Sequence, residues 1–324
     1  MYAYIVRRLF ISVLLLIGAT FISFWLVSLT GDPLGELRSL PNISEERIAL
    51  IREGRGLDEP FYVRYWMWVT AIPTDGFGSY LLRDAPIWPE LQRALGHTLQ
   101  LVLAAEVVAL SVGIGLGLIS AKRQYSILDY SITGLNFIQF AVPVFALALI
   151  LQVLAIRLND ASGVQFFYLA NLSSPNPGTG LSFWLDRAHH LVLPVLALAG
   201  LGTASYSRYM RASMLEVVNS DYVRTARAKG LREGRITFKH AFRNALLPIV
   251  TLAGISIGNV FTGAIVTEAV FGLDGMGAFF IRYLQGRDPY AVMAFLLVTG
   301  VAILVANLIV DLLYGVLDPR IRHD

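Results

Sequence analysis

The chain contains uncharged apolar runs that are long enough to cross a lipid bilayer. Residues 9–30 hold no charged side chain, and neither do residues 130–156. As a helix, the first run would be roughly 33 Å long, which exceeds the bilayer core of about 30 Å. Charged residues make up only 15% of the chain, whereas soluble domains carry about 25%. We therefore predict an all-α integral membrane protein.

With four further apolar segments, one of which contains the acid Glu106, these runs predict six transmembrane helices. Arg7 and Arg8 precede the first segment and place the N-terminus in the cytoplasm under the positive-inside rule. A cleaved signal peptide is the alternative, but the first run is longer than the apolar part of a signal and no Ala-x-Ala site follows it. Six spans put both termini in the cytoplasm. The predicted spans are residues 9–30, 98–121, 130–156, 191–207, 245–267 and 289–310.

A basic stretch separates the fourth and fifth predicted spans. Residues 208–243 contain nine Lys/Arg and three Asp/Glu. Gly230 lies between two runs of good helix formers, so we expect a helix, a glycine-based turn and a second helix. Pro248 opens the next apolar run, where a proline fits a first helical turn. This hairpin should lie in the cytoplasm, and it is large enough to be gripped by another protein.

The sequence disfavours several classes of function. It has no cysteine, which excludes disulfides and thiolate metal sites. It has no Gly-Lys-Ser/Thr, so the phosphate-binding loop of P-loop ATPases is absent and another chain must hydrolyse any ATP that drives transport. Neither of the catalytic motifs His-Glu-x-x-His and Gly-x-Ser-x-Gly occurs, so a membrane enzyme is the least favoured class of function. We predict no catalytic site and no metal site, and topology explains the basic charge without nucleic acid.

Polar residues inside the predicted spans are candidates for a translocation path, because polar groups in a bilayer usually face the bundle interior or water. In the fifth span, spacings of three, four and four put four such residues on one helix face. Hydrogen bonding between helices is the alternative role for this face. Gln139 of the third span is a further path candidate. The four residues of the fifth span are Ser256, Asn259, Gly263 and Thr267.

Other polar and small residues in the spans are expected to hold the helices together. Glu106 is the one acid well inside a predicted span, and we expect it to pair with a neighbouring helix. A role in sensing a substrate amino group or relaying a proton is the alternative. Gly113 and Gly117 form a small-xxx-small pair that allows close helix approach. A structural role is also expected for Asn136, Asn307 and Asp311.

The predicted external segments carry further candidates. In residues 31–96, Ser44 is expected to cap a helix that ends near Gly54. The aromatic stretch that follows, residues 56–69, suits a membrane interface. Charged residues between the last two spans either contact a docked protein or are simply solvated. These are Glu268 and the docking candidates Asp274, Arg282, Arg287 and Asp288, and all five are expected at the external mouth.

Residues 224–231 resemble a loop motif of binding-protein-dependent ABC importer permeases. The motif reads Glu-Ala-Ala, three residues, then Gly, and here Arg224, Thr225 and Ala226 are followed after three residues by Gly230. The Arg in place of Glu, and a proline that comes late after the glycine, are typical of the dipeptide/oligopeptide subgroup. Three more segments resemble that subgroup in the same order, so the resemblance covers nearly the whole chain. These segments are residues 56–61 followed by 75–79, residues 268–292, and residues 307–320.

The resemblance implies a type I ABC importer permease fold in the inner or plasma membrane. Residues 1–96 would form the first span and an external segment, and residues 97–318 a five-helix permease core with a coupling hairpin at 208–244. Residues 319–324 would be a cytoplasmic tail. In this family the hairpin docks into a cytoplasmic ATPase. The implied coupling residues are Arg224, Thr225, Ala226, Lys229, Gly230, Leu231 and Arg232.

The resemblance also implies the partners and the function. The chain would be a non-enzymatic subunit that forms the path with a homologous second permease. Two ATPase chains would bind ATP and Mg, with no cofactor in this chain, and an external binding protein would deliver dipeptides or oligopeptides. Nickel, haem or glutathione are alternative cargoes of the same class. An ion-driven secondary transporter is a weaker alternative, because the sequence shows no internal repeat and one buried acid.

Overall fold

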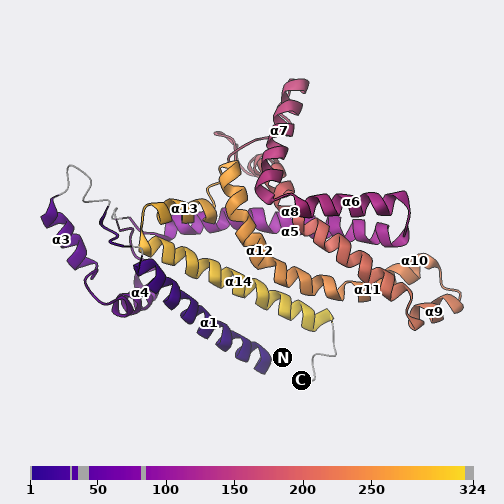
Figure 1. Cartoon of the computed structure of the whole chain (residues 1–324), viewed down its shortest axis with the longest axis horizontal. Helices are drawn as coiled ribbons and strands as arrows, with labels where there is room; N and C mark the ends of the chain where they lie inside the picture. Colours follow the sequence, from indigo (N-terminus) through magenta and orange to yellow (C-terminus); the bar gives the residue numbers. More distant parts are fainter. Residues whose placement is uncertain (1, 30, 36–43, 82–84, 318–324) are drawn as a thin grey trace. The chain divides into compact units, whose positions relative to one another are not determined.

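The computed structural model describes residues 2–29, 31–35, 44–81 and 85–317, apart from the side chains of residues 2–5, 240, 255, 257–263 and 310–317. Within these ranges the regular structure is helical, and an isolated bridge joins Ser79 to Pro86. The fold class is therefore the predicted one (Figure 1). The elements are α1 (Tyr2–Ser28), α3 (Glu45–Gly54), α4 (Phe61–Asp75), α5 (Trp88–Lys122), α6 (Ile127–Ala141), α7 (Val144–Ser162), α8 (Leu181–Val218), α9 (Asp221–Ala228), α10 (Glu233–Arg235), the π-helical turn η1 (Ile236–Ala241), α11 (Phe242–Ala245), α12 (Leu247–Phe271), α13 (Met276–Gln285) and α14 (Pro289–Leu317).

Among the described residues, five helices are long and apolar enough to cross a membrane. They lie in α1, α5, α7, α8 and α14. A sixth span is obtained if the broken pair Ala264–Phe271 and Met276–Gln285 counts as one. These helices confirm a multi-pass membrane protein.

The third predicted span is not one continuous helix. α6 ends at Ala141 and α7 begins at Val144, with Val142 in an extended conformation (φ −92°, ψ 118°). Pro143 explains the break, because a residue that precedes proline is disfavoured in the helical region. The prediction of a single helix over residues 130–156 was therefore wrong.

The chain divides into two compact units, which are described separately. One unit comprises residues 1–96 and 278–304, and the other comprises residues 97–277 and 305–324. Three helices pass from one unit to the other, namely α5, α13 and α14.

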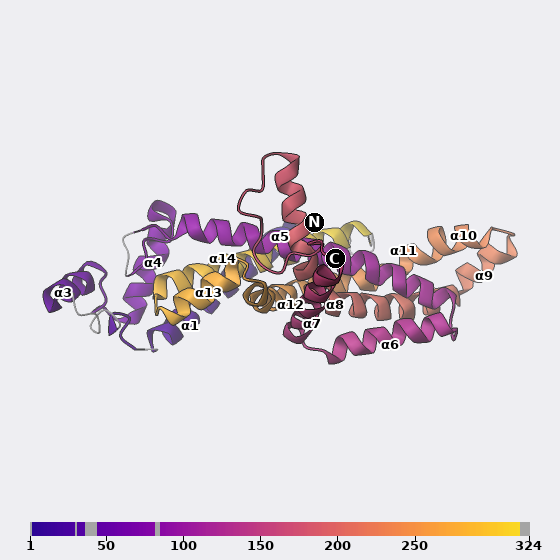
Figure 2. The same ribbon diagram turned by 90° about the horizontal axis from the view of Figure 1, so that it is seen from above.

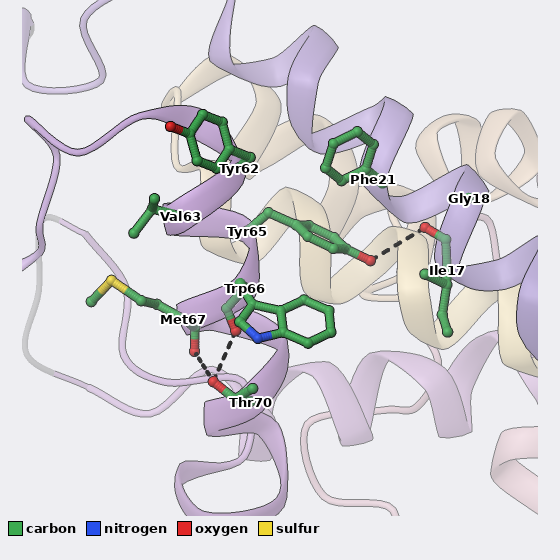
Figure 3. Close-up of a pocket in the computed structure, with 9 residues that line it drawn as sticks. All are labelled: Ile17, Gly18, Phe21, Tyr62, Val63, Tyr65, Trp66, Met67 and Thr70. Atoms are coloured by element: carbon green, nitrogen blue, oxygen red, sulfur yellow. Dashed lines mark hydrogen bonds between the residues drawn. The ribbon is translucent and has the colours of Figure 1, made fainter.

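In the first unit, α4 packs against the middle of α1. Tyr65 lies 2.9 Å, hydroxyl to hydroxyl, from Thr20, and its hydroxyl is also 3.2 Å from the carbonyl oxygen of Ile17 (Figure 3). Phe24 is 2% exposed and packs on the rings of Tyr65 and Trp68. Beside this contact lies an apolar groove of about 700 Å³ between the two helices. Two aromatic residues of this stretch, Tyr65 and Trp68, thus form the α1–α4 contact.

Hydrogen bonds made by side chains also stabilise the rest of the first unit. Ser44 caps α3 as predicted, accepting a hydrogen bond from the backbone N–H of Arg47 at 3.3 Å. The carboxylate of Glu90 accepts hydrogen bonds from the hydroxyls of Tyr80 and Tyr283 at 2.8 and 2.9 Å. The rings of Tyr80 and Tyr283 also stack, with their centroids 4.6 Å apart. These contacts connect the segment after α4 to α13.

In the second unit, α8 is the central helix and contacts α6, α7 and α12. α5 crosses α8 closely at the predicted glycine pair. A Cβ atom at Gly113 would lie 2.7 Å from Cβ of Tyr206, and one at Gly117 would lie 2.5 Å from the carbonyl oxygen of Ser207. The small-xxx-small pair therefore does allow the close approach that the sequence predicted.

Candidate functional site: the basic hairpin and the polar core

Residues 208–218 of the basic stretch continue α8, so the helical hairpin is shorter than predicted and begins with α9, after two linking residues. In both views α9 and α10 project beyond the ends of α5 and α6 (Figures 1 and 2). Gly230 makes the turn with φ +73°, which confirms the predicted glycine-based turn. The second helix is less regular than expected, because α10 has three residues and is followed by the π-helical turn.

A small apolar core holds the hairpin together. Val223, Ala226 and Ile236 are buried, and Leu231 packs against them. Val217, near the end of α8, packs on the same core. The hairpin is thus fixed to the helix that leads into it.

The hairpin exposes basic and aromatic side chains. Of the predicted coupling residues, Ala226 is buried and Leu231 is half-buried, while the other five are exposed. Tyr222 and Phe238 are 45% and 58% exposed and were not predicted. The ammonium nitrogen of Lys122, at the end of α5, lies 4.9 Å from the centre of the Phe238 ring. Exposed aromatic and Arg side chains together are typical of a protein-docking surface.

A buried ion pair ties the last turns of α8 to the α5–α6 connection. Arg211 donates two hydrogen bonds to the carboxylate of Asp129, from Nε at 2.8 Å and from Nη2 at 2.7 Å. The hydroxyl of Ser120 and the backbone N–H of Tyr125 donate to the same carboxylate. Arg211 and these donors hold the pKa of Asp129 well below its usual range, although burial opposes the shift. No local pattern indicated this pair, because its members lie 82 residues apart.

A polar contact joins three helices inside the second unit. The hydroxyl of Tyr206 donates to Glu106 of α5 at 2.5 Å and lies 2.6 Å from the hydroxyl oxygen of Ser256 on α12. Asn136 of α6 donates to Ser207 of α8 at 3.0 Å. The expectations that Glu106 pairs with a neighbouring helix and that Asn136 has a structural role are confirmed.

The predicted path residues differ in their surroundings. Ser256 is engaged by Tyr206, and Thr267 is 0% exposed within the chain. Gln139 is half-buried on α6. For Asn259, Gly263 and the structural candidate Asp311, the structure describes the helical backbone but not the surroundings of the residue. The structure thus brings Ser256 into a hydrogen-bonded cluster and buries Thr267.

A polar residue missed by sequence reasoning is Gln152 of α7. Its amide donates to the carbonyl oxygens of Leu169 and Val270, at 2.9 and 3.2 Å. It thereby links α7, the α7–α8 connection and α12. A lone Gln in an apolar helix is the only signal that pointed to it.

The four predicted docking residues also separate into two groups. Asp274, Arg282 and Arg287 are exposed, whereas Asp288 is 4% exposed. Asp288 accepts hydrogen bonds from the backbone N–H groups of Leu81, Tyr290 and Ala291. Burial raises the pKa of this carboxyl, and the three N–H groups oppose that shift. The expectation that Asp288 lies on the surface was wrong.

His189 and His190 are adjacent residues of α8, and both rings contact Tyr168. His190 is 4% exposed, stacks on Tyr168 at 3.9 Å and lies 3.7 Å from a carboxylate oxygen of Asp186. Across the described residues, no group of three His, Cys, Asp or Glu side chains could hold a metal ion.

Comparison with known families defines the class of the protein. Residues 113–323 match the family described as the binding-protein-dependent transport system inner membrane component. Residues 1–88 match the N-terminal part of the same kind of membrane component. The chain therefore belongs to the family of inner membrane components of binding-protein-dependent transport systems.

Individual relatives match over nearly their full length. The chain is 39% identical over 326 residues to the oligopeptide transport system permease protein AppB of Bacillus subtilis, covering 100% of both chains. It is 36% identical to the dipeptide transport system permease protein DppB of Escherichia coli K12, covering 100% of this chain and 99% of the relative. It is also 36% identical to OppB, an oligopeptide transport system permease protein of Mycobacterium tuberculosis H37Rv, covering 98% of each.

Solved structures support the fold. A chain of the inward-facing MetNI methionine ABC transporter aligns with a TM-score of 0.57 at 16% identity, and covers 73% of this chain and 100% of its own length. A second crystal form aligns with a TM-score of 0.56. At this identity the likeness shows a shared helical fold and carries no information on substrate.

Proposed function

We propose that the chain is the permease subunit of an ABC importer that moves dipeptides or oligopeptides inward. The observation that carries this proposal is the full-length similarity to proteins named as dipeptide and oligopeptide permeases. A path in this chain can be permissive, so peptide length would be selected by a separate binding protein. Nickel, haem or glutathione are alternative cargoes for the same architecture.

The proposed assembly contains this chain, a homologous second permease, two ATPases and an external binding protein. Both termini and the basic hairpin would face the cytoplasm, in keeping with the positive-inside rule. ATP and Mg would be bound by the ATPases and not by this chain. Each hairpin would insert its exposed basic and aromatic face into a groove of one ATPase.

Coupling would work by displacement of the hairpin. When the ATPases close on ATP, they would carry the hairpins with them. The hairpin core includes Val217 of α8, and Lys122 at the end of α5 lies over Phe238. The Asp129–Arg211 pair adds α6 to this set. A displacement of the hairpin would therefore be passed to α5, α6 and α8 together.

The path would run along α12, with Ser256, Asn259, Gly263 and Thr267 on one face and Gln139 of α6 as a further contributor. At the external side, Asp274, Arg282 and Arg287 are the exposed candidates for contact with the binding protein. An ion-driven secondary transporter needs no ATPase, so the presence of bound ATPases separates it from the importer.

The first test is a pull-down of the detergent-solubilised protein from its native membrane, with partners identified by mass spectrometry and assayed for ATPase activity. We expect a second permease and P-loop ATPases, and we expect the recovery of ATPase to fall when residues 221–235 are deleted. Recovery of the chain without any ATPase would overturn the importer and favour the secondary transporter. A binding protein recovered with the complex would then be used to test peptide cargo directly.

Replacing Gly230 with alanine should weaken ATPase docking. A residue with a Cβ atom at φ +73° is strained by about 1–2 kcal/mol, so the turn between α9 and α10 should distort. We expect several-fold less ATPase to co-purify with the Gly230→Ala variant, and transport to fall with it. Gly234→Ala is the matched control, because Gly234 is a neighbouring exposed glycine in α10 with open space around it. Equal ATPase recovery from both variants would contradict the proposed docking.

A further inference from the structure

We infer that Glu268 and Thr98 form a clamp that sets the start of α13 and keeps the external end of the path closed between transport cycles. The inference rests on the proposed importer function and adds two positioning residues to it. It concerns the break between α12 and α13, and the residues that carry it belong to the second unit.

The break is short and sharply defined. α12 ends at Phe271, the chain turns at Gly272 with φ +59°, and α13 begins at Met276. The first N–H groups of any helix lack a partner within the helix. Here the amides of Met276 and Gly277 are such groups, and both residues are buried.

Two side chains satisfy these amides. The carboxylate of Glu268 accepts from the N–H of Gly277 at 2.7 Å. The hydroxyl of Thr98 accepts a hydrogen bond from the N–H of Met276 at 2.8 Å, and it donates a hydrogen bond to the carboxylate of Glu268. Glu268 and Thr98 are 1% and 2% exposed. One buried network therefore joins α5, the end of α12 and the start of α13, and the negative charge lies where a helix N-terminus favours it.

The glycines of the break leave room for this network. A Cβ atom at Gly277 would lie 2.5 Å from Cα of Ile265 and 3.0 Å from Oε2 of Glu268. A Cβ atom at Gly275 would overlap the Glu268 carboxylate. The spacing of the glycines is thus set by the carboxylate that they enclose, which the sequence alone did not reveal.

The position of the clamp argues for a role in transport beyond local stability. Glu268 directly follows Thr267, the last of the α12 residues proposed to line the path. Two turns further along α5 from Thr98, Glu106 is joined through Tyr206 to Ser256 of α12. α5 and α12 are thus connected at two levels, and the clamp is the outer one. In secondary transporters, discontinuous helices of this kind form substrate and ion sites.

The test uses the importer reconstituted in liposomes, with Thr98→Val, Thr98→Ser and Glu268→Gln variants. Valine has the shape of threonine but removes the hydroxyl, whereas serine keeps it. The chain has no cysteine, so a Thr267→Cys substitution adds a single reporter at a fully buried site near the clamp. Measured quantities are peptide transport per assembled complex, ATPase activity without binding protein, and maleimide labelling of the reporter from outside.

We expect Thr98→Val and Glu268→Gln to lower transport per complex by about tenfold and to raise labelling of the reporter by a similar factor, a typical size for coupling between sites. ATPase activity without binding protein should rise in these variants. Thr98→Ser should behave as the parent protein does. Thr98→Val replaces the hydroxyl with a methyl group, whereas Thr98→Ser keeps the hydroxyl and loses the methyl group. Each compared with the parent, the two variants separate the hydrogen bonds from side-chain packing.

Two outcomes would overturn the inference. One is labelling and transport per complex in Thr98→Val equal to those in Thr98→Ser. The other is a fall in the amount of assembled complex with unchanged activity and labelling per complex, which would make the clamp a local structural feature. Failure of the parent importer to move any peptide would instead count against the proposed function, and the labelling comparison would still test the clamp.

Discussion

Replacing Gly117 with valine should prevent α5 and α8 from packing, and the protein should fail to accumulate in the membrane. A Cβ atom at this position would lie 2.5 Å from the carbonyl oxygen of Ser207 and 2.6 Å from Cβ of Met210. The first of these is a backbone atom of the central helix, so no side-chain rotation relieves the clash. We expect a loss of about 3 kcal/mol or more, at the upper end for overpacked cores.

Gly115 provides the matched control for this substitution. It belongs to the same run of glycines on α5, two residues away, but a Cβ atom there would have no neighbour within 4 Å. Gly115→Val should reach the membrane at the level of the parent protein and melt at the same temperature in detergent. Equal membrane levels of the Gly115 and Gly117 variants would show that the two helices do not cross at Gly117.

Features that depend on local sequence were predicted well. Gly230 was expected to turn the hairpin because good helix formers flank it, and it has the expected positive φ. The glycine spacing on α5 predicted a close helix crossing, which the structure places against Tyr206 and Ser207. Ser44 caps α3 as its position before two acids indicated. In each case the residues that decide the structure lie within one or two helical turns of each other.

Features that depend on distant partners were not predictable in the same way. Asp288 was placed on the surface because charged residues usually lie there, yet the backbone N–H of Leu81, 207 residues away, is one of its partners. Glu268 was grouped with the residues of the external mouth, but Thr98 and the start of α13 bury it. A buried carboxylate requires donors, and a single sequence does not show which distant segment supplies them.

The third predicted span shows that the length of an apolar run does not locate a helix break. The apolar run at residues 130–156 was long enough for one span, but Pro143 and the extended Val142 divide it into α6 and α7. Length and hydropathy fix how much chain can be buried in lipid, and they do not fix where a helix bends. The residue before a proline is a better guide to that position.

Asp129→Asn should separate ATP hydrolysis from transport. Asp129 is 2% exposed on its side chain, and its partner Arg211 is 27% exposed. Removing one member of a buried pair leaves the other without its counter-charge, which costs up to about 3 kcal/mol for such sites. Because α8 runs from Arg211 directly into the hairpin, the ATPases should still dock and hydrolyse ATP. Transport should fall, since α6 would no longer follow the hairpin.

The pH dependence of this pair follows from the direction of its pKa shift. Arg211 holds the pKa of Asp129 below its usual range. A carboxyl with a lowered folded-state pKa stabilises the fold fully above its unfolded value of about 3.9, and that contribution is lost as the pH falls through the folded value. The melting temperature of the parent protein minus that of Asp129→Asn should therefore be constant from pH 6 to 8 and shrink only in strong acid.

An exposed ion pair in the hairpin supplies the control. Arg227 and Glu233 lie 2.7 Å apart, but their side chains are 41% and 67% exposed, and exposed pairs contribute little to stability. Glu233→Gln should leave the melting temperature unchanged. If Asp129→Asn also melts as the parent does and transports at the parent rate, the buried pair is not what connects α6 to the hairpin. If it melts lower but keeps a constant ratio of peptide moved to ATP hydrolysed, the pair stabilises the fold and the displacement must pass through the Val217 and Lys122 contacts instead.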